Sequence, residues 1–300
     1  MDTTTSDATP LSGVFLPLIT PFRDGALDEA SLARLVAHFA ATPVAGFVLA
    51  ATTGEGLTLD EEETARLVAL TAAEARGLPL WLGLCGSDTR RLKQLLDQTA
   101  RWPIAGHLVA CPYYSRPSQE GLRQHFTELA RDAAKPILLY NIPYRTGVNL
   151  ANDTLLRLAE LPVIVGVKDC CTDPSQSLDL LRRRPPGFAV LTGEDALFHT
   201  ALGQGADGGI LASAMTDPAA FVALRDRVLA GDGAGAAERW DRVVDLVRLL
   251  FAEPNPAPLK HWLWRSGLIA SPELRLPMTG ISPALAGQLD RLFWQRRAAA

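Results

Sequence analysis

The feature that most constrains the fold of this chain is a regular alternation of short apolar runs with longer segments of helical periodicity. Eight runs have the length of a strand, and a segment able to form a helix follows each of them. They cover residues 14–19, 46–50, 80–84, 107–110, 137–140, 163–167, 189–191 and 209–212. Continuous apolar runs predict strands that are buried on both faces, and crossover helices imply that the strands are parallel.

Eight such units in succession favour an α/β fold of the closed (β/α)8 or TIM-barrel type over an open doubly wound sheet. No G-x-G-x-x-G motif follows the first run, which argues against a dinucleotide-binding fold. Beyond about Asp217 the pattern is wholly helical, and a proline-rich stretch at 253–258 interrupts it. We therefore expect a disordered tail over residues 1–12, a catalytic barrel over 13–235 and a C-terminal helical appendage over 236–300.

Polar residues mark the starts of several of these helices. Residues 28–31 precede one apolar face, and residues 118–120 and 151–153 begin later helices. The segment 58–61 (Thr-Leu-Asp-Glu) resembles a capping box in front of another apolar stripe.

Charge and composition exclude several classes of partner. The net charge of −4 provides no basic field for nucleic acid or an anionic membrane. The polar first ten residues do not resemble a signal peptide, and no apolar run reaches the roughly 18 residues of a membrane helix. The four cysteines lack CxxC spacing and the five histidines are scattered, so we expect no metal site and place the protein in the reducing cytoplasm.

Lys168 is the strongest candidate for covalent chemistry. Only four of the 29 basic residues are lysines, and this one directly follows the apolar run 163–167. In a TIM barrel, catalytic groups lie at the C-terminal ends of the strands. Apolar walls favour the neutral amine, which can attack a ketone and form an imine. The alternative is a lysine that only pairs with Asp169.

Other strand ends supply groups that suit the same chemistry. Tyr140 ends the preceding run, where a phenol can donate and accept protons beside Lys168, although a tyrosine there also fits simple packing. Arg145 lies on the turn after it and suits a substrate carboxylate, or else is an ordinary surface arginine. Thr52 and Thr53 follow the second run and offer hydroxyl and N–H groups, although Thr-Thr-Gly is also a common turn. Gly193 follows the seventh run and permits a close approach to the backbone.

Taken in order along the chain, these loops resemble the dihydrodipicolinate synthase / N-acetylneuraminate lyase family, from about Gly13 to the C-terminal helices. The motifs that carry the resemblance are Thr52-Thr53-Gly54-Glu55, Tyr113-Tyr114-Ser115-Arg116-Pro117-Ser118-Gln119-Glu120-Gly121, Tyr140-Asn141-Ile142-Pro143-Tyr144-Arg145-Thr146-Gly147, Val167-Lys168-Asp169 and Glu253-Pro254-Asn255-Pro256. Five ordered motifs are highly specific for the family and less specific for one member of it.

The resemblance implies a catalytic set. Lys168 would form an imine with pyruvate and need no other cofactor. Tyr140, Thr52 and Tyr114 would relay protons, with Tyr114 reaching into the site of a neighbouring subunit. The resemblance also implies a homotetramer built as a dimer of dimers.

It implies a binding set as well. Thr53 and the Gly193 loop would hold the carboxylate of pyruvate, Arg145 would receive the carboxylate of aspartate β-semialdehyde, and the backbone of Ile210 would face the site. The implied reaction is condensation of these two substrates to 4-hydroxy-tetrahydrodipicolinate, in the diaminopimelate route to lysine. Tyr140 near the protonated imine would be stabilised as a phenolate when it is needed.

Three positions depart from the family pattern: Ala51 replaces a glycine, Asp169 replaces a glutamate and Tyr144 replaces a small residue. Because Tyr144 narrows the acceptor side, another pyruvate-linked aldolase stays an alternative: a keto-deoxy-sugar acid aldolase, an N-acetylneuraminate lyase or a hydratase-aldolase. A barrel that binds ligand without catalysis is the alternative from another class. The ligands of the family's lysine feedback site are poorly matched by Gly56, Glu61, Thr64, Ser87 and Arg91, so we expect weak or absent lysine inhibition.

Overall fold

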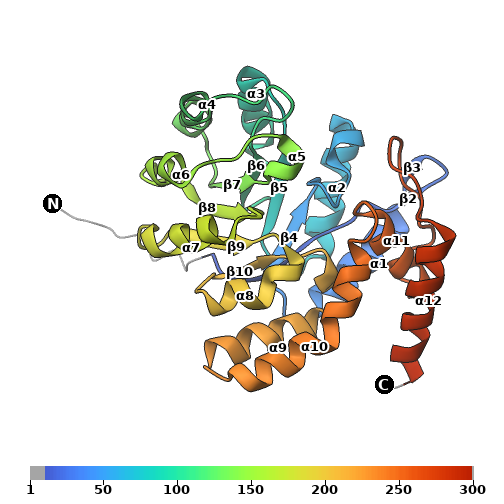
Figure 1. Ribbon diagram of the computed structural model, residues 1–300. Coiled ribbons are helices and arrows are strands. Elements are labelled where there is room, and N and C mark those ends of the chain that lie inside the picture. Colours follow the sequence, from blue (N-terminus) through green and yellow to red (C-terminus); the bar gives the residue numbers. More distant parts are fainter. Residues whose placement is uncertain (1–10, 299–300) are drawn as a thin grey trace.

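Parallel strands close into a barrel in this computed structural model, which describes residues 11–298 (Figure 1). Within those residues eight strands form the barrel, in the neighbour order β1-β10-β9-β8-β7-β6-β5-β4 with β1 paired to β4. They are β1 (Gly13–Pro17), β4 (Gly46–Leu49), β5 (Leu80–Leu84), β6 (Gly106–Ala110), β7 (Ile137–Asn141), β8 (Ile164–Asp169), β9 (Ala189–Thr192) and β10 (Gly208–Ile210). The predicted TIM barrel is confirmed.

The predicted strands agree with the observed ones to within two residues at each end. The differences have local causes. β4 ends at Leu49 because Ala50 takes a left-handed conformation, with φ 51°. β10 ends at Ile210 because a 3-10 turn, η3 (Ser213–Thr216), begins shortly after it. A separate hairpin of β2 (Phe22–Arg23) and β3 (Ala26–Leu27) lies outside the barrel.

The strands are apolar on both faces because each face meets a different core. Side chains such as Phe15, Leu138 and Leu191 pack inside the barrel, in the same cluster as Tyr140 and Ile210. Their neighbours along the strands pack outward into the larger core beneath the helices. This two-sided burial explains the continuous apolar runs of the sequence.

Helices surround the barrel and connect its strands (Figure 1). They are α1 (Glu29–Ala40), α2 (Glu61–Glu74), α3 (Thr89–Thr99), α4 (Gln119–Arg131), α5 (Pro143–Thr146), α6 (Asn152–Leu158), α7 (Pro174–Arg183), α8 (Phe198–Gly203) and α9 (Pro218–Leu229), with the short 3-10 turns η1 (Gly56–Thr58) and η2 (Asp195–Leu197). Asp28 and Ser118 cap α1 and α4 as expected. The capping box of α2 was placed wrongly: it joins Asp60 to Glu63, because Thr58 is already part of η1.

Three helices form the C-terminal part of the chain: α10 (Gly233–Leu250), α11 (Ala257–Arg265) and α12 (Pro283–Ala298). The proline-rich stretch separates α10 from α11, as the sequence predicts. The boundary expected after residue 235 falls in the first turn of α10. Residues 1–10 of the expected tail lie outside the described part of the chain. Among residues 11–298, no helix is both long and apolar enough to cross a membrane.

Helix α10 packs against α9, whereas α11 and α12 lie toward α1 and the β2–β3 hairpin (Figure 1). The Arg34 side chain donates to the carbonyl oxygen of Leu268, and the N–H of Ala270 donates to Ser31. The Glu273 carboxylate accepts from backbone N–H groups of the hairpin. The segment between α11 and α12 therefore joins the C-terminal part of the chain to α1 and the hairpin.

Candidate active site

Seven of the eight predicted site residues line one cavity at the C-terminal ends of the strands. They are Thr52, Thr53, Tyr140, Arg145, Lys168, Gly193 and Ile210. The eighth, Tyr114, does not line this cavity. Residues that are up to 158 positions apart in the sequence meet here because parallel strands bring their C-terminal ends to the same rim.

Lys168 is held inside the barrel near the end of β8, and only 5% of it is exposed. Burial lowers the pKa of its amine, while the nearby groups of Cys170, Asp195 and Glu194 oppose that shift. Lowering the pKa raises the fraction of neutral amine, which is the nucleophilic form. No ion pair with Asp169 occurs in the described structure: that carboxylate accepts instead from the N–H of Cys171 and the hydroxyl of Ser177.

Tyr140 is the direct partner of Lys168. The two residues face each other across the β7–β8 ladder, and the Nζ of Lys168 lies 3.3 Å from the Tyr140 hydroxyl oxygen. Burial raises the pKa of Tyr140, and a hydrogen bond with Thr52 opposes the rise. Tyr140 is therefore a neutral phenol in this structure, and a phenolate here would need a nearby positive charge to stabilise it.

The loop after β4 offers an anion cradle. Thr53 is buried, and its hydroxyl oxygen accepts a hydrogen bond of 2.9 Å from the side-chain amide of Asn255. Between residues 11 and 298, the backbone N–H groups of Thr52 and Thr53 find no protein acceptor. With Thr53 accepting from Asn255, its own proton stays free to be donated toward the cavity.

Gly193 makes room for the lysine. A Cβ atom at this position would overlap the Cε of Lys168 and the sulfur of Cys170. Its N–H donates a 2.8 Å hydrogen bond to the carbonyl oxygen of Asp169. That N–H is occupied, so the structure gives Gly193 a spatial role, and its expected part in carboxylate binding stays a prediction.

Arg145 and Ile210 complete the predicted set at the rim. Arg145 lies exposed on the short helix α5, and in the described part of the chain no carboxylate comes within ion-pair distance of it. Its guanidinium lies 6.0 Å from the ring centre of Tyr144. Ile210 ends β10, is 1% exposed and lines the cavity, and the expected role of its backbone stays a prediction.

Tyr114 points away from this cavity. It is 94% exposed on the loop after β6, its φ is 67°, and its N–H donates to the carbonyl oxygen of Thr146. A large aromatic side chain that is held outward on a left-handed backbone fits the expectation that it serves a neighbouring subunit. That expectation stays a prediction.

Sequence reasoning assigned no role to two other polar groups that line the cavity, Asn255 and Asp195. Asn255 contacts Thr53, and Asp195 accepts two hydrogen bonds from Ser213. Burial raises the pKa of Asp195 to about 6. The Tyr144 hydroxyl donates a 2.8 Å hydrogen bond to Glu194, which joins the β7 and β9 loops. Asp195 and Glu194 directly follow Gly193 at a strand end, so their position was the available signal.

No metal-binding group is evident among residues 11–298: no three His, Cys, Asp or Glu side chains are arranged to hold an ion. The four cysteines are free thiols, and burial raises the pKa of Cys170 beside the lysine. The buried amine of Lys168 stays the predicted nucleophile of this site.

A buried amine beside a neutral phenol, at the C-terminal mouth of a (β/α)8 barrel, defines the class of lyases that work through a lysine Schiff base, the class I aldolase type. Similarity to known proteins narrows the class. The chain belongs to the Dihydrodipicolinate synthetase family, whose sequence profile matches residues 10–294. It is 44% identical over 284 residues to "4-hydroxy-tetrahydrodipicolinate synthase 2" of Clostridium acetobutylicum, covering 94% of this chain and 99% of that protein.

Solved structures agree. The crystal structure of dihydrodipicolinate synthase from Aquifex aeolicus superposes with a TM-score of 0.92 at 32% identity, covering 95% of this chain and 98% of that one. A monomeric dihydrodipicolinate synthase variant superposes equally well, with a TM-score of 0.92, 32% identity and coverage of 95% and 96%. One protein with this fold and family name is thus described as a monomeric variant, so the oligomer of this chain needs its own argument.

Proposed function

We propose that this enzyme condenses pyruvate with aspartate β-semialdehyde to 4-hydroxy-tetrahydrodipicolinate, in the diaminopimelate route to lysine. The observation that carries the proposal is the 3.3 Å contact between the buried amine of Lys168 and the hydroxyl of Tyr140, in a chain that belongs to this family. The reaction needs no cofactor besides the imine on Lys168.

The reaction begins when the neutral amine of Lys168 attacks the ketone carbon of pyruvate. The adduct loses water and becomes a protonated imine. This imine withdraws electrons from the adjacent methyl group, so a methyl proton leaves and an enamine forms. Tyr140 lies close enough to donate a proton to the departing oxygen and to accept one in the next step.

The enamine carbon then attacks the aldehyde carbon of the second substrate and forms the new C–C bond. The aldehyde oxygen takes up a proton and becomes the 4-hydroxyl group. The amine of the acceptor attacks the imine carbon, the ring closes and Lys168 leaves as a free amine. Each proton released by one step is consumed by another, with Tyr140 and Thr52 as the relay.

Two cationic or polar sites would hold the carboxylates of the substrates. The Thr53 hydroxyl and the free N–H groups of its loop suit the carboxylate of pyruvate, which stays near Lys168. Arg145 has no carboxylate partner within residues 11–298 and suits the carboxylate of the acceptor. The Tyr144–Glu194 contact borders the same cavity and limits the acceptor to a short chain.

We also propose a cytoplasmic homotetramer, a dimer of dimers, in which Tyr114 enters the site of its neighbour. An apolar cleft adjoins Thr52 and Tyr140, and Leu57 and Tyr113 line it. Leu57 is 68% exposed and Tyr114 is 94% exposed. Burying these side chains against a second copy would remove them from water and bring a phenol to the relay. The division into a barrel over residues 13–235 and a helical unit over 236–300 belongs to the same proposal.

Borohydride reduction in the presence of pyruvate tests the covalent step. We expect mass spectrometry to find the reduced pyruvate adduct on Lys168 and to find none on Lys168→Arg, which should also lose at least about 10⁴-fold in turnover because it has no nucleophile. Near-normal turnover by Lys168→Arg would refute the mechanism.

A coupled assay with aspartate β-semialdehyde tests the acceptor. We expect turnover with this aldehyde and no release of pyruvate from sugar acids. An adduct on Lys168 without turnover of the semialdehyde, together with cleavage of a keto-deoxy-sugar acid, would assign the chain to another pyruvate-linked aldolase. Absence of any adduct would indicate a binding protein.

A further inference from the structure

A buried ion pair joins the loop after β4 to the C-terminal helices. The Nζ of Lys260, on α11, lies 2.5 Å from a carboxylate oxygen of Glu55. The two side chains are 0% and 2% exposed. Glu55 is two residues after Thr53, so this contact anchors the segment that presents the carboxylate cradle.

The amine of Lys260 has two further contacts. Besides Glu55, it donates a 2.7 Å hydrogen bond to the carbonyl oxygen of Glu273, and its Nζ lies 4.3 Å from the ring centre of Phe22. Burial lowers the pKa of Lys260, and Glu55 opposes that shift. The amine therefore contacts the barrel loop, the appendage and the β2–β3 hairpin at the same time.

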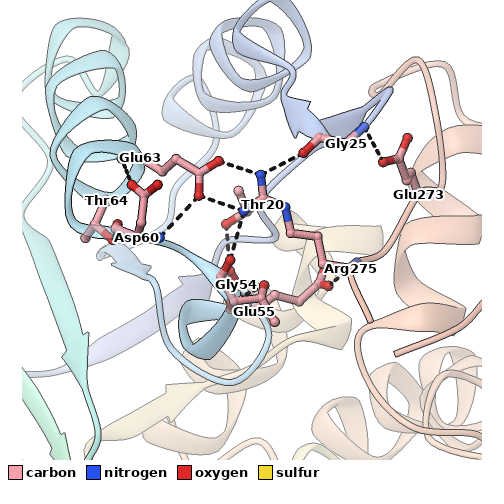
Figure 2. A network of polar contacts seen from close by, with 10 residues as sticks. Thr20, Gly25, Gly54, Glu55, Asp60, Glu63, Thr64, Glu273 and Arg275 are labelled. Carbon is pink, nitrogen blue, oxygen red and sulfur yellow. Dashed lines mark hydrogen bonds and ion pairs between the residues drawn. The ribbon is translucent and has the colours of Figure 1, made fainter. Parts of the chain in front are cut away.

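A second chain segment holds the other oxygen of Glu55. The N–H of Arg275 donates a 3.1 Å hydrogen bond to it, and the Arg275 guanidinium donates to the carbonyl oxygen of Thr58 and to the Glu63 carboxylate. Figure 2 shows Arg275 lying between the Glu55 loop, Glu63 and the hairpin residue Gly25. On the barrel side, the Thr20 hydroxyl donates a 2.6 Å hydrogen bond to the carbonyl oxygen of Gly54.

The backbone that these contacts hold is not a relaxed one. Glu55 and Ala50 both have left-handed φ angles, 52° and 51°, although neither is a glycine. The chain also folds back so tightly that a Cβ at Gly56 would overlap the carbonyl oxygen of Ala50. Residues in such conformations persist only where the surroundings determine them, and they gather at functional sites.

The ion pair is not expected to contribute much net free energy to folding. Replacing a buried pair by apolar side chains of similar volume is often neutral for folding, because desolvation cancels most of the attraction. In some proteins a buried ion pair instead fixes one conformation of the chain. Here the geometry that it fixes is that of the Thr52–Thr53 segment.

We propose that the Glu55–Lys260 ion pair is a positioning device, through which the C-terminal helical unit holds the Thr52–Thr53 loop in the shape that binds the carboxylate of pyruvate. Glu55 and Lys260 are positioning residues, since neither lines the cavity around Lys168. The contact of Asn255 with Thr53 serves the same purpose from the same part of the chain. This inference rests on the proposed function, because it concerns the binding of pyruvate.

The double variant Glu55→Gln/Lys260→Met tests the proposal. It removes both charges, so it leaves no buried unpaired ion and should melt within a few degrees of the wild type. The matched control is Asp290→Asn, which removes the contacts of α12 with His261 and Arg265 on α11, the helix that carries Lys260, and leaves the loop untouched.

The measurement is the pyruvate concentration that half-saturates the rate of borohydride-trapped adduct formation, together with the KM values of both substrates. We expect the double variant to need about 10- to 100-fold more pyruvate, since a displacement of about 1 Å is enough for such a loss. The KM of the acceptor and all values of the control should stay near those of the wild type.

The outcomes separate this inference from the proposed function. A folded double variant whose pyruvate dependence stays within about twofold of the wild type would overturn the inference alone. A wild-type protein that forms no adduct would overturn the proposed function. If the double variant does not fold, Glu55→Asp alone decides, because it keeps both charges and shortens the side chain that joins the loop to Lys260. An unchanged pyruvate dependence there also refutes the positioning role.

Discussion

Replacing Gly193 by alanine probes the site with the smallest possible addition. The new Cβ would overlap two atoms at once, the Cε of Lys168 and the sulfur of Cys170, and both side chains are almost completely buried. Neither can move into solvent. The N–H of residue 193 is also fixed by its hydrogen bond to Asp169, so the backbone cannot shift freely away.

The size of the effect of Gly193→Ala on stability and rate depends on which atoms move to relieve the overlap. If the protein absorbs it as strain in the native state, overpacking costs about 1–3 kcal/mol of stability. If the lysine gives way, its Nζ moves by about 1 Å from a partner that is already 3.3 Å away, and such a misplacement costs about 10²-fold in rate. The flexible lysine chain yields more easily than the strands, so we expect Gly193→Ala to lose about 100-fold in kcat/KM for pyruvate with a small change in melting temperature.

The control is Gly203→Ala, at the end of α8, where an added Cβ meets nothing within 4 Å. It should keep wild-type turnover and stability. Steady-state kinetics and borohydride trapping on the three proteins give the comparison. Turnover of Gly193→Ala within about threefold of the wild type would show that the space beside Lys168 is not limiting, and would refute the packing argument.

Three further predictions concern Tyr140, Asp195 and the effect of added lysine. Tyr140→Phe should lower kcat by about 10²- to 10⁴-fold with only a small change in melting temperature, since it removes the proton relay and the hydrogen bonds of one hydroxyl. A loss below tenfold would contradict the relay. Burial raises the pKa of Asp195 to about 6, above its ordinary value of 3.8, so its favourable contribution to stability is complete below about pH 4 and is lost as the pH rises through 6. The wild type should therefore lose up to about 3 kcal/mol relative to Asp195→Asn between pH 4 and 7, and parallel thermal-denaturation curves across that range would disprove this. Millimolar lysine should leave turnover nearly unchanged, because Glu61, Thr64 and Arg91 depart from the ligands expected of the family's lysine feedback site. Half-maximal inhibition at submillimolar lysine would show the opposite.

The sequence was sufficient for the barrel because each strand is apolar on both faces. Residues 80–84 were predicted and observed with the same bounds, and the other strands differ by one or two residues. The starts of α1 and α4 were also correct, since Asp28 and Ser118 are strong caps. The start of α2 was misjudged, because Thr58 and Asp60 both suit a cap and only the turn η1 decides between them.

The covalent part of the site was predictable for a geometric reason. Tyr140 and Lys168 end successive parallel strands, and neighbouring strands of a barrel place their ends side by side. The contact of Asn255 with Thr53 joins residues 202 positions apart, and that between Lys260 and Glu55 likewise joins distant segments. No periodicity or local motif reports such a contact, because it depends on how the C-terminal helices pack against the barrel.

The raised pKa of Tyr140 limits the order in which the proton transfers can occur. A phenol whose pKa is raised by burial cannot be the base that first activates the lysine, so the amine must already be neutral, as the lowered pKa of Lys168 favours. Tyr140 can then act first only as an acid, toward the oxygen that leaves pyruvate. Once it has given up that proton, the phenolate faces the positive charge of the new imine, which stabilises it in a buried site where it otherwise would not persist. The same pair of residues thus supplies the acid for dehydration and, one step later, the base that takes the methyl proton.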